Sequence, residues 1–270
     1  MTLDLSKLWD HGKPEVSEQR FRAALPTASP EEKLILQTQI ARTYGIRRDF
    51  AHAREILAAI EREIQNASAE PQARYFLELG RTYASATHSP ETQTIESREK
   101  AKSAYMRAFE ITEKARLDYL AIDALHMMAV VDTEPQDQLA WDMKAVTFME
   151  NSSQPEARQW EGTLRNNLGY ALHLLGRYEE ALTQFKLALE ARERAGNPQT
   201  IRIAHWMIAW TLRALGRIQE AVDIQLRLER EWDEAGEPDP YVFDELMILY
   251  RELGDHAKVE HYVQRRQNVE

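Results

Sequence analysis

The sequence predicts an all-α protein built from a repeated pair of helices. Leucine, alanine, glutamate, glutamine and arginine dominate its composition, and all five are strong helix formers. Glycine and proline number only 10 each, too few for a turn-rich all-β chain. Two stretches of the same pattern, 175–182 (LGRYEEAL) and 215–222 (LGRIQEAV), align without a gap. A fixed period of this kind is typical of repeat architectures.

Each of these stretches is predicted to be the turn between two helices. An apolar helical pattern precedes it, at 168–175 and at 208–215. A longer amphipathic run follows it and ends at 195–198 (AGNP) or 235–238 (AGEP). Glycine followed closely by proline stops a helix, because glycine adopts the left-handed cap and proline cannot continue the hydrogen-bond ladder. One repeat is therefore a helix, a tight turn and a second helix.

Small and large residues recur within these helices at fixed positions. The clearest unit has Leu168-Gly169, Leu172, Ala181, Phe185 and Ala188. The first, second, fifth and sixth units have Ile40-Ala41, Tyr44, Ala53, Leu57, Ile60; Leu79-Gly80, Tyr83, Ala101, Tyr105, Ala108; Ile208-Ala209, Leu212, Ala221; and Leu246, Tyr250, Val259, Val263. The third unit fits at Met127-Met128, Val131 and Ala140, but Lys144 stands where a large apolar residue is expected, as Gln225 does in the fifth.

This pattern resembles the tetratricopeptide repeat in a longer form, with a period of about 40 residues. The resemblance implies a right-handed superhelical solenoid of about six helix pairs, because one pair cannot bury its apolar face without the next. Ser17, Phe21 and Ala24 have the spacing of a second helix, so we expect an N-terminal half-repeat. The chain is interpreted as one domain, 1–270, with a cap at 1–30 and six repeats at 31–268.

Composition argues against several classes of partner. The formal net charge is -10, which disfavours binding to nucleic acid. The chain has no cysteine, so disulfides and thiolate metal sites are excluded. The first residues lack the pattern of a signal peptide, and no apolar run is long enough to span a membrane. We therefore expect a cytoplasmic protein that binds neither nucleic acid nor membrane.

The sequence contains no recognisable catalytic motif. It has no glycine-rich phosphate loop, no His-Glu-x-x-His and no Gly-x-Ser-x-Gly. No two histidines are three or four residues apart, so a metal site on one helix is not expected. Asp132, Glu134 and Asp137 cluster but do not match a calcium loop, and they are interpreted as helix-capping carboxylates. We expect no enzyme activity, no cofactor and no metal.

In the tetratricopeptide architecture the first helix of each pair lines a concave groove, and this resemblance selects the candidate binding residues. They are Arg42, Arg74, Arg81, Asn166, Tyr170, His173, Trp206, Trp210 and Arg213. Asparagine can bond a peptide backbone, arginine pairs with carboxylates, and tryptophan and tyrosine are common at binding hot spots. Two alternatives remain open: the tryptophans pack between helices, and the arginines pair with nearby glutamates.

The sequence favours a non-catalytic scaffold or regulatory adaptor that binds a protein or peptide with acidic and apolar parts. The first alternative is a self-associating structural protein, a homodimer formed through Val259, Tyr262 and Val263 of an uncovered last helix. The second is an enzyme or small-molecule sensor, which no motif supports.

Overall fold

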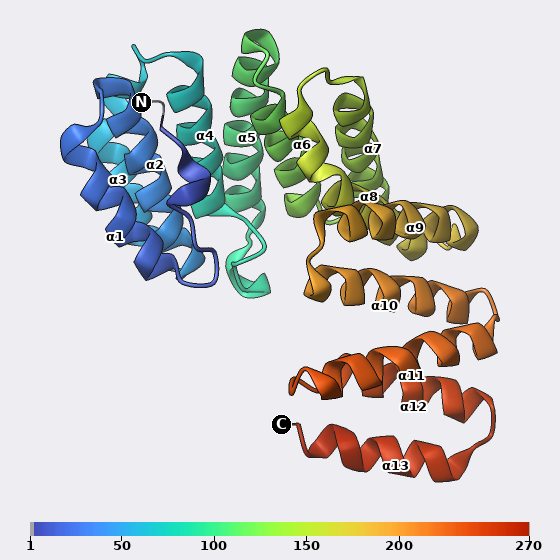
Figure 1. The fold of residues 1–270 in the computed structure, drawn as a ribbon. Helices are drawn as coiled ribbons and strands as arrows, with labels where there is room; N and C mark the ends of the chain where they lie inside the picture. Colours follow the sequence, from blue (N-terminus) through green and yellow to red (C-terminus); the bar gives the residue numbers. More distant parts are fainter. Residues whose placement is uncertain (1–2, 270) are drawn as a thin grey trace. The chain divides into compact units, whose positions relative to one another are not determined.

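The computed structural model describes residues 3–269, and these residues form thirteen α-helices and no β-strand (Figure 1). The α-helices are α1 (Pro14–Ala24), α2 (Pro30–Ile46), α3 (Phe50–Ile64), α4 (Ala69–Tyr83), α5 (Ile95–Ala115), α6 (Asp118–Val131), α7 (Pro135–Asn151), α8 (Glu161–Leu174), α9 (Tyr178–Ala195), α10 (Pro198–Ala214), α11 (Ile218–Glu234), α12 (Pro240–Glu252) and α13 (His256–Gln267). Short 3-10 turns are η1 (Leu5–Lys7), η2 (Leu25–Thr27), η3 (Pro90–Thr92) and η4 (Pro155–Trp160).

The predicted all-α fold is confirmed. After α1, the helices form six consecutive antiparallel pairs, from α2 and α3 to α12 and α13. Helix α1 buries Ser17 and Phe21, so it covers the first pair as the half-repeat was expected to do. Phe21 packs there with Leu36 and Ile40 of α2.

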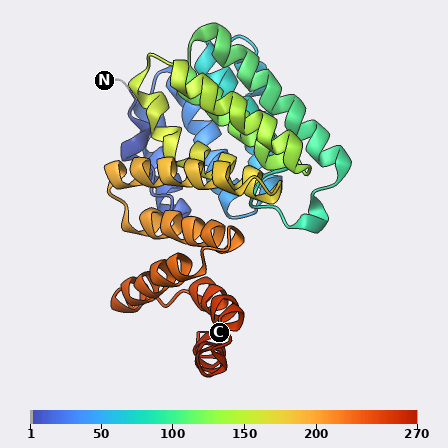
Figure 2. The ribbon, with the colours of Figure 1, turned by 90° about the vertical axis from the view of Figure 1, so that its right-hand side faces the viewer.

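The chain divides into two compact units, which we describe separately. Unit 1 is Met1–Trp160 and contains α1 to α7; unit 2 is Glu161–Glu270 and contains α8 to α13. Within unit 2, the turned view in Figure 2 shows the helices following one another as stacked pairs. The first helices of successive pairs are neighbours in both units: α2 with α4, α4 with α6, and α10 with α12.

Local signals set where the helices begin and end. Ser29 and Glu32 form a capping box at the start of α2, in which each side chain bonds the backbone N–H of the other residue. Asn197 caps α10 by accepting a hydrogen bond from the Thr200 N–H. Gly176 and Gly216 adopt φ angles of 73° and 72° in the tight turns after α8 and α10, a conformation that side chains with a Cβ disfavour.

A glycine opposite an aromatic ring allows two paired helices to cross closely. A Cβ on Gly80 of α4 would lie 2.4 Å from the Tyr105 ring of α5. A Cβ on Gly169 of α8 would lie 2.7 Å from the Phe185 ring of α9. The Tyr105 hydroxyl also donates to the Ala84 carbonyl at 2.7 Å. This confirms the packing role expected of the small and large residues in the repeat.

The predicted register of α7 is wrong. Ala140 and Lys144 are exposed, and the Lys144 ammonium lies 4.5 Å from the centre of the Phe109 ring. The helix instead buries Leu139 and Asp142. Asp142 is the eighth residue of α7, the place that Phe185 holds in α9, so an acid fills a large apolar position.

The fifth unit has the expected register, with a polar residue in the same place. Gln225 is the eighth residue of α11 and is completely buried. Neither polar atom of its side chain has a hydrogen-bond partner among the described residues. The third and fifth units therefore match the repeat pattern poorly, because each buries a polar residue at a position where the pattern has a large apolar one.

The last helix turns its largest apolar side chain inward. Tyr262 of α13 is buried, and its ring lies 5.8 Å from that of Tyr250 on α12. Its hydroxyl donates to the Glu229 carboxylate at 3.0 Å. Tyr262 is thus unavailable for the dimer surface that the sequence suggested.

Candidate functional site

Four candidate residues come together as one aromatic cluster on α8 and α10 of unit 2. The Tyr170 ring lies 5.8 Å from the Trp210 ring, with an angle of 22° between their planes. Trp206, one turn earlier on α10, lies 5.9 Å from Trp210. The His173 ring stacks on Trp210 at a centre-to-centre distance of 3.3 Å. Adjacent helices therefore present a continuous row of rings.

Hydrogen bonds hold two members of this cluster, His173 and Trp206. His173 Nδ1 lies 3.1 Å from the Thr211 hydroxyl, and burial together with the nearby Arg213 lowers the pKa of His173 to about 4. The imidazole is thus neutral near pH 7 and stacks on Trp210 without a charge. Trp206 Nε1 donates to the Tyr241 carbonyl of α12 at 3.3 Å.

The rings of the cluster pack against one another and also remain partly exposed. The two tryptophans are therefore neither wholly buried between helices nor wholly on the surface. Trp206 and Trp210 are half-buried, whereas Tyr170 is 46% exposed. Two further apolar side chains extend the exposed area, Ile203 at 42% and Tyr241 at 67%. We refer to these five residues as the aromatic face. Contiguous exposed apolar surface of this kind is characteristic of interaction sites.

Asn166 lies one turn before Tyr170 on α8. Its Oδ1 is buried and accepts no hydrogen bond from any residue between 3 and 269. A buried amide oxygen without a donor is uncommon in a folded protein. The Asn166 side chain therefore holds a buried acceptor whose hydrogen-bonding capacity the described residues do not use.

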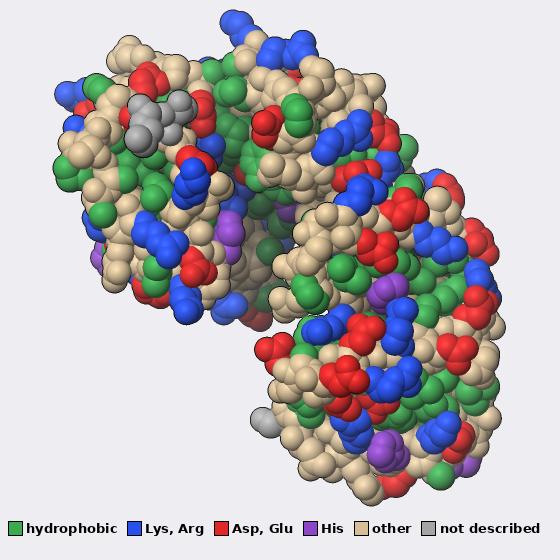
Figure 3. Space-filling model, viewed as in Figure 1, with side chains coloured by type: hydrophobic (Ala, Val, Ile, Leu, Met, Phe, Trp, Pro, Cys, Tyr) green, Lys and Arg blue, Asp and Glu red, His purple; other side chains and the backbone are tan. Residues whose placement is uncertain are grey.

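Arg213 is an internal partner rather than a free cation. Its guanidinium binds both carboxylate oxygens of Glu245 on α12, at 2.8 and 2.9 Å. On the visible face of unit 2, acidic and basic side chains are interspersed (Figure 3). Arg213 consequently adds no unpaired positive charge beside the aromatic face.

The candidate arginines of unit 1 also have internal partners. Arg81 donates to Glu78 at 2.6 Å and to the buried Asp123 at 2.5 Å, while Arg42 reaches Glu78 at 3.2 Å. Burial opposes ionisation of Asp123, but Arg81 and Arg42 outweigh it and lower the pKa of this carboxyl. Arg74 pairs with Glu70 at 2.9 Å. The alternative of arginines paired with nearby acids is therefore the observed arrangement.

Unit 1 has a cavity of about 650 Å³ beside these arginines. Trp9, Tyr119 and Trp160 contribute to its walls together with Arg42 and Arg74. Trp9 is fixed by a hydrogen bond from its Nε1 to the Gln39 side chain at 3.0 Å. The cavity combines aromatic walls with arginines that are already paired.

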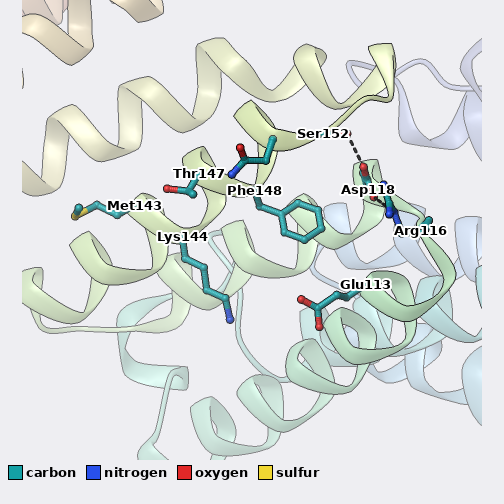
Figure 4. A pocket seen from close by; sticks show the side chains of 9 residues that line it. Glu113, Arg116, Asp118, Met143, Lys144, Thr147, Phe148 and Ser152 are labelled. Atoms are coloured by element: carbon teal, nitrogen blue, oxygen red, sulfur yellow. Dashed lines mark hydrogen bonds and ion pairs between the residues drawn. The ribbon is translucent and has the colours of Figure 1, made fainter.

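A second hollow of about 610 Å³ lies between the end of α5 and α7 (Figure 4). Lys144 and Glu113 face it, and Phe148 forms part of its wall. Ser152 donates to Asp118 at 2.5 Å, so this serine and acid hold the chain between α7 and η4. Positively and negatively charged side chains both line the hollow, so its charge favours no class of ligand.

Two general properties of the described residues concern metals and membranes. No group of three or more histidine, cysteine, aspartate or glutamate side chains in residues 3–269 is placed to hold a metal ion. No helix in the same range is both long and apolar enough to cross a bilayer.

Sequence reasoning left open that the arginines pair with glutamates, but it did not identify the acids that neutralise them. Arg42 pairs with Glu78, Arg81 with Asp123 and Arg213 with Glu245, at separations of 36, 42 and 32 residues. Each separation is close to one repeat length. The first helices of successive repeats are neighbours. Opposite charges one repeat apart on these helices were therefore the sequence signal that could have predicted the ion pairs.

The comparisons with known proteins agree with this architecture. Residues 160–229 match the family described as Tetratricopeptide repeat. No curated protein sequence matches the chain at a significant level.

Three solved structures show the similarity in fold. The apo form of RapI is 12% identical, with a TM-score of 0.73 over 98% of this chain and 73% of that one. A signal-transduction ATPase with a tetratricopeptide-repeat sensor, from Pyrococcus horikoshii, is 12% identical with a TM-score of 0.72, and the match covers 95% of this chain and 39% of that one. A Rap protein complexed with Competence and Sporulation Factor is 16% identical, with a TM-score of 0.59 over 93% and 69% of the two chains.

The helix pairs, their glycine–aromatic crossings and these similarities define an all-α helical-repeat protein. Residues 160–229 match the tetratricopeptide repeat family, and the chain has the fold of a tetratricopeptide-repeat solenoid.

Proposed function

We propose that this protein is a non-catalytic scaffold or regulatory adaptor that binds a peptide segment of a partner on the aromatic face of unit 2. The observation that carries the proposal is the row of Tyr170, Trp210 and Trp206, which is stacked across two helices and still partly exposed. Rigid aromatic side chains give large contact area at low entropic cost, and they dominate binding hot spots.

Asn166 complements the aromatic face. Its buried Oδ1 has no donor among the described residues. A rotation of the side chain toward the surface would offer this acceptor to a backbone N–H of an extended peptide, next to rings that bind side chains. The Rap protein complexed with Competence and Sporulation Factor supports the proposal, since a similar fold there holds a bound factor. A cytoplasmic location belongs to the same proposal.

The test is selection of peptides from a random twelve-residue phage library on the immobilised full chain. We expect the wild type to enrich a family of related sequences, and Tyr170→Ala and Trp210→Ala to lose most of that enrichment. Tyr170 is exposed enough for its truncation to leave the fold intact, which circular dichroism checks. The matched control is Ile95→Ala, which removes a 72% exposed apolar side chain in unit 1.

Two outcomes contradict the proposal. One is the absence of any enriched family on the wild-type chain. The other is a family that binds Tyr170→Ala and Trp210→Ala as well as it binds the wild type, which would place the binding surface elsewhere.

A further inference from the structure

A small pocket opens at one end of the aromatic face. It has a volume of about 250 Å³ and is lined by Arg202, Ile203, Trp206, Asp239 and Tyr241. The hydrogen bond from Trp206 Nε1 to the Tyr241 carbonyl fixes α10 against the first turn of α12 at this point. The volume suits one large side chain, with apolar walls on Ile203, Trp206 and Tyr241.

Asp239 is the uncompensated charge of this pocket. It is half-buried, and its Oδ1 accepts a hydrogen bond from the Tyr241 N–H at 2.9 Å. No lysine, arginine or histidine among residues 3–269 forms an ion pair with it. Burial raises the pKa of Asp239, and the neighbouring Asp244 raises it further, so the carboxylate would gain from a cation.

The other charges near the pocket have partners. Arg202 lies over the Trp232 ring at 4.4 Å, and its Nε is 3.8 Å from Glu231. Asp244 pairs with Arg266 at 3.2 Å. Glu231 also lies 3.6 Å from Arg227. Asp239 is the one carboxylate that lines the pocket, and it stands against aromatic walls without an ion-pair partner of its own.

We propose that this pocket receives a lysine or arginine side chain of the bound peptide. The aliphatic stem lies along Ile203 and Trp206, and the cationic head pairs with the Asp239 carboxylate. Long basic side chains combine an apolar stem with a charged tip, and aromatic faces attract cations. The inference rests on the proposed peptide binding and names the class of peptide: basic and apolar.

A basic peptide replaces the acidic one that the candidate arginines had led us to expect from the sequence. Arg42, Arg81 and Arg213 are each paired with a carboxylate inside their own unit, so an acidic ligand would have to break those pairs. The net charge of -10 favours encounter with a basic segment.

The experiment repeats the phage selection on wild type, Asp239→Asn and a matched control, Asp255→Asn. Asparagine is as good an N-cap as aspartate, so Asp239→Asn keeps the bond to the Tyr241 N–H and removes only the charge. Asp255 is also half-buried and caps α13 by accepting from the Lys258 N–H. We expect lysine or arginine at one fixed position on wild type and Asp255→Asn, and no basic preference there on Asp239→Asn.

A binding measurement on one enriched peptide isolates the charge pair. Replacing its basic residue by norleucine for lysine, or by citrulline for arginine, should weaken binding to the wild type about tenfold, as expected for a close interfacial charge pair. The same replacement should change binding to Asp239→Asn by less than about twofold, because the partner charge is already absent.

The outcomes separate the two proposals. Peptides that need Tyr170 and Trp210 but show no basic preference overturn this inference and leave peptide binding intact. Equal losses on wild type and Asp239→Asn also overturn it. A library that yields no enriched family overturns both.

Discussion

Arg213 of α10 binds Glu245 of α12 through two parallel hydrogen bonds, joining the first helices of neighbouring repeats. The Glu245 side chain is only 6% exposed, so its charge depends on this arginine for compensation. Trp210 lies one turn before Arg213 on the same helix. The pair of Arg213 and Glu245 therefore holds together the two helices that carry most of the aromatic face.

Removing one member of this pair should cost more than removing both. Arg213→Met leaves a buried carboxylate unpaired, and we expect the free energy of unfolding to fall by about 3 kcal/mol. The double variant Arg213→Met with Glu245→Met should lose clearly less unfolding free energy, because it leaves no buried charge without a partner. Urea unfolding of the wild type, both single variants and the double variant measures the coupling. Strictly additive losses would show that the two side chains act independently.

Two glycines of unit 1 should respond differently to replacement by alanine, one with a clear loss of stability and the other without. Gly80→Ala would force a methyl group into the Tyr105 ring, and we expect a loss of about 1–3 kcal/mol in unfolding free energy. Gly45→Ala adds a methyl group with nothing within 4 Å, in the last turn of α2. It should be neutral or stabilise by up to about 1 kcal/mol, because alanine favours the helix. Thermal unfolding of both variants makes the comparison, and equal melting temperatures would contradict the close crossing.

Asp142 should make the stability of the protein fall as pH rises between about 4 and 7. Burial raises its pKa to about 7 in the folded chain, against an ordinary value of 3.8. The folded state therefore holds the proton more tightly than the unfolded state, and stability is highest at the acid end of this range. The full difference of about three pKa units corresponds to on the order of 4 kcal/mol.

Asp142→Asn tests this dependence because asparagine does not ionise. The variant should have nearly the stability of the wild type at pH 4 and exceed it by several kcal/mol at pH 8, in urea unfolding with the pH varied. Asp137→Asn is the control, since Asp137 is exposed in the first turn of the same helix. A gap between Asp142→Asn and wild type that stays constant over the whole range would refute the prediction.

The repeat could be predicted largely from short-range pattern. Ala53, Ala101, Ala181 and Ala221 are all completely buried at their expected places, because small residues are needed wherever two paired helices cross. Helix ends could be predicted for the same local reason, from Gly196 and Gly236. The register of α7 could not, since its pattern contains an acid at the position that normally identifies the helix face.

The sequence by itself determined the helices, their pairing and which side chains line the first helices, since these follow from periodicity and from neighbours close in the chain. Only the tertiary structure decided what those side chains do. Arg42, Arg81 and Arg213 became internal ion pairs because repeat stacking brings acids 32 to 42 residues away into contact. The same stacking left Tyr170 exposed beside Trp210 and left Asp239 without a cation, and those two facts direct the search for a partner toward a basic, apolar peptide.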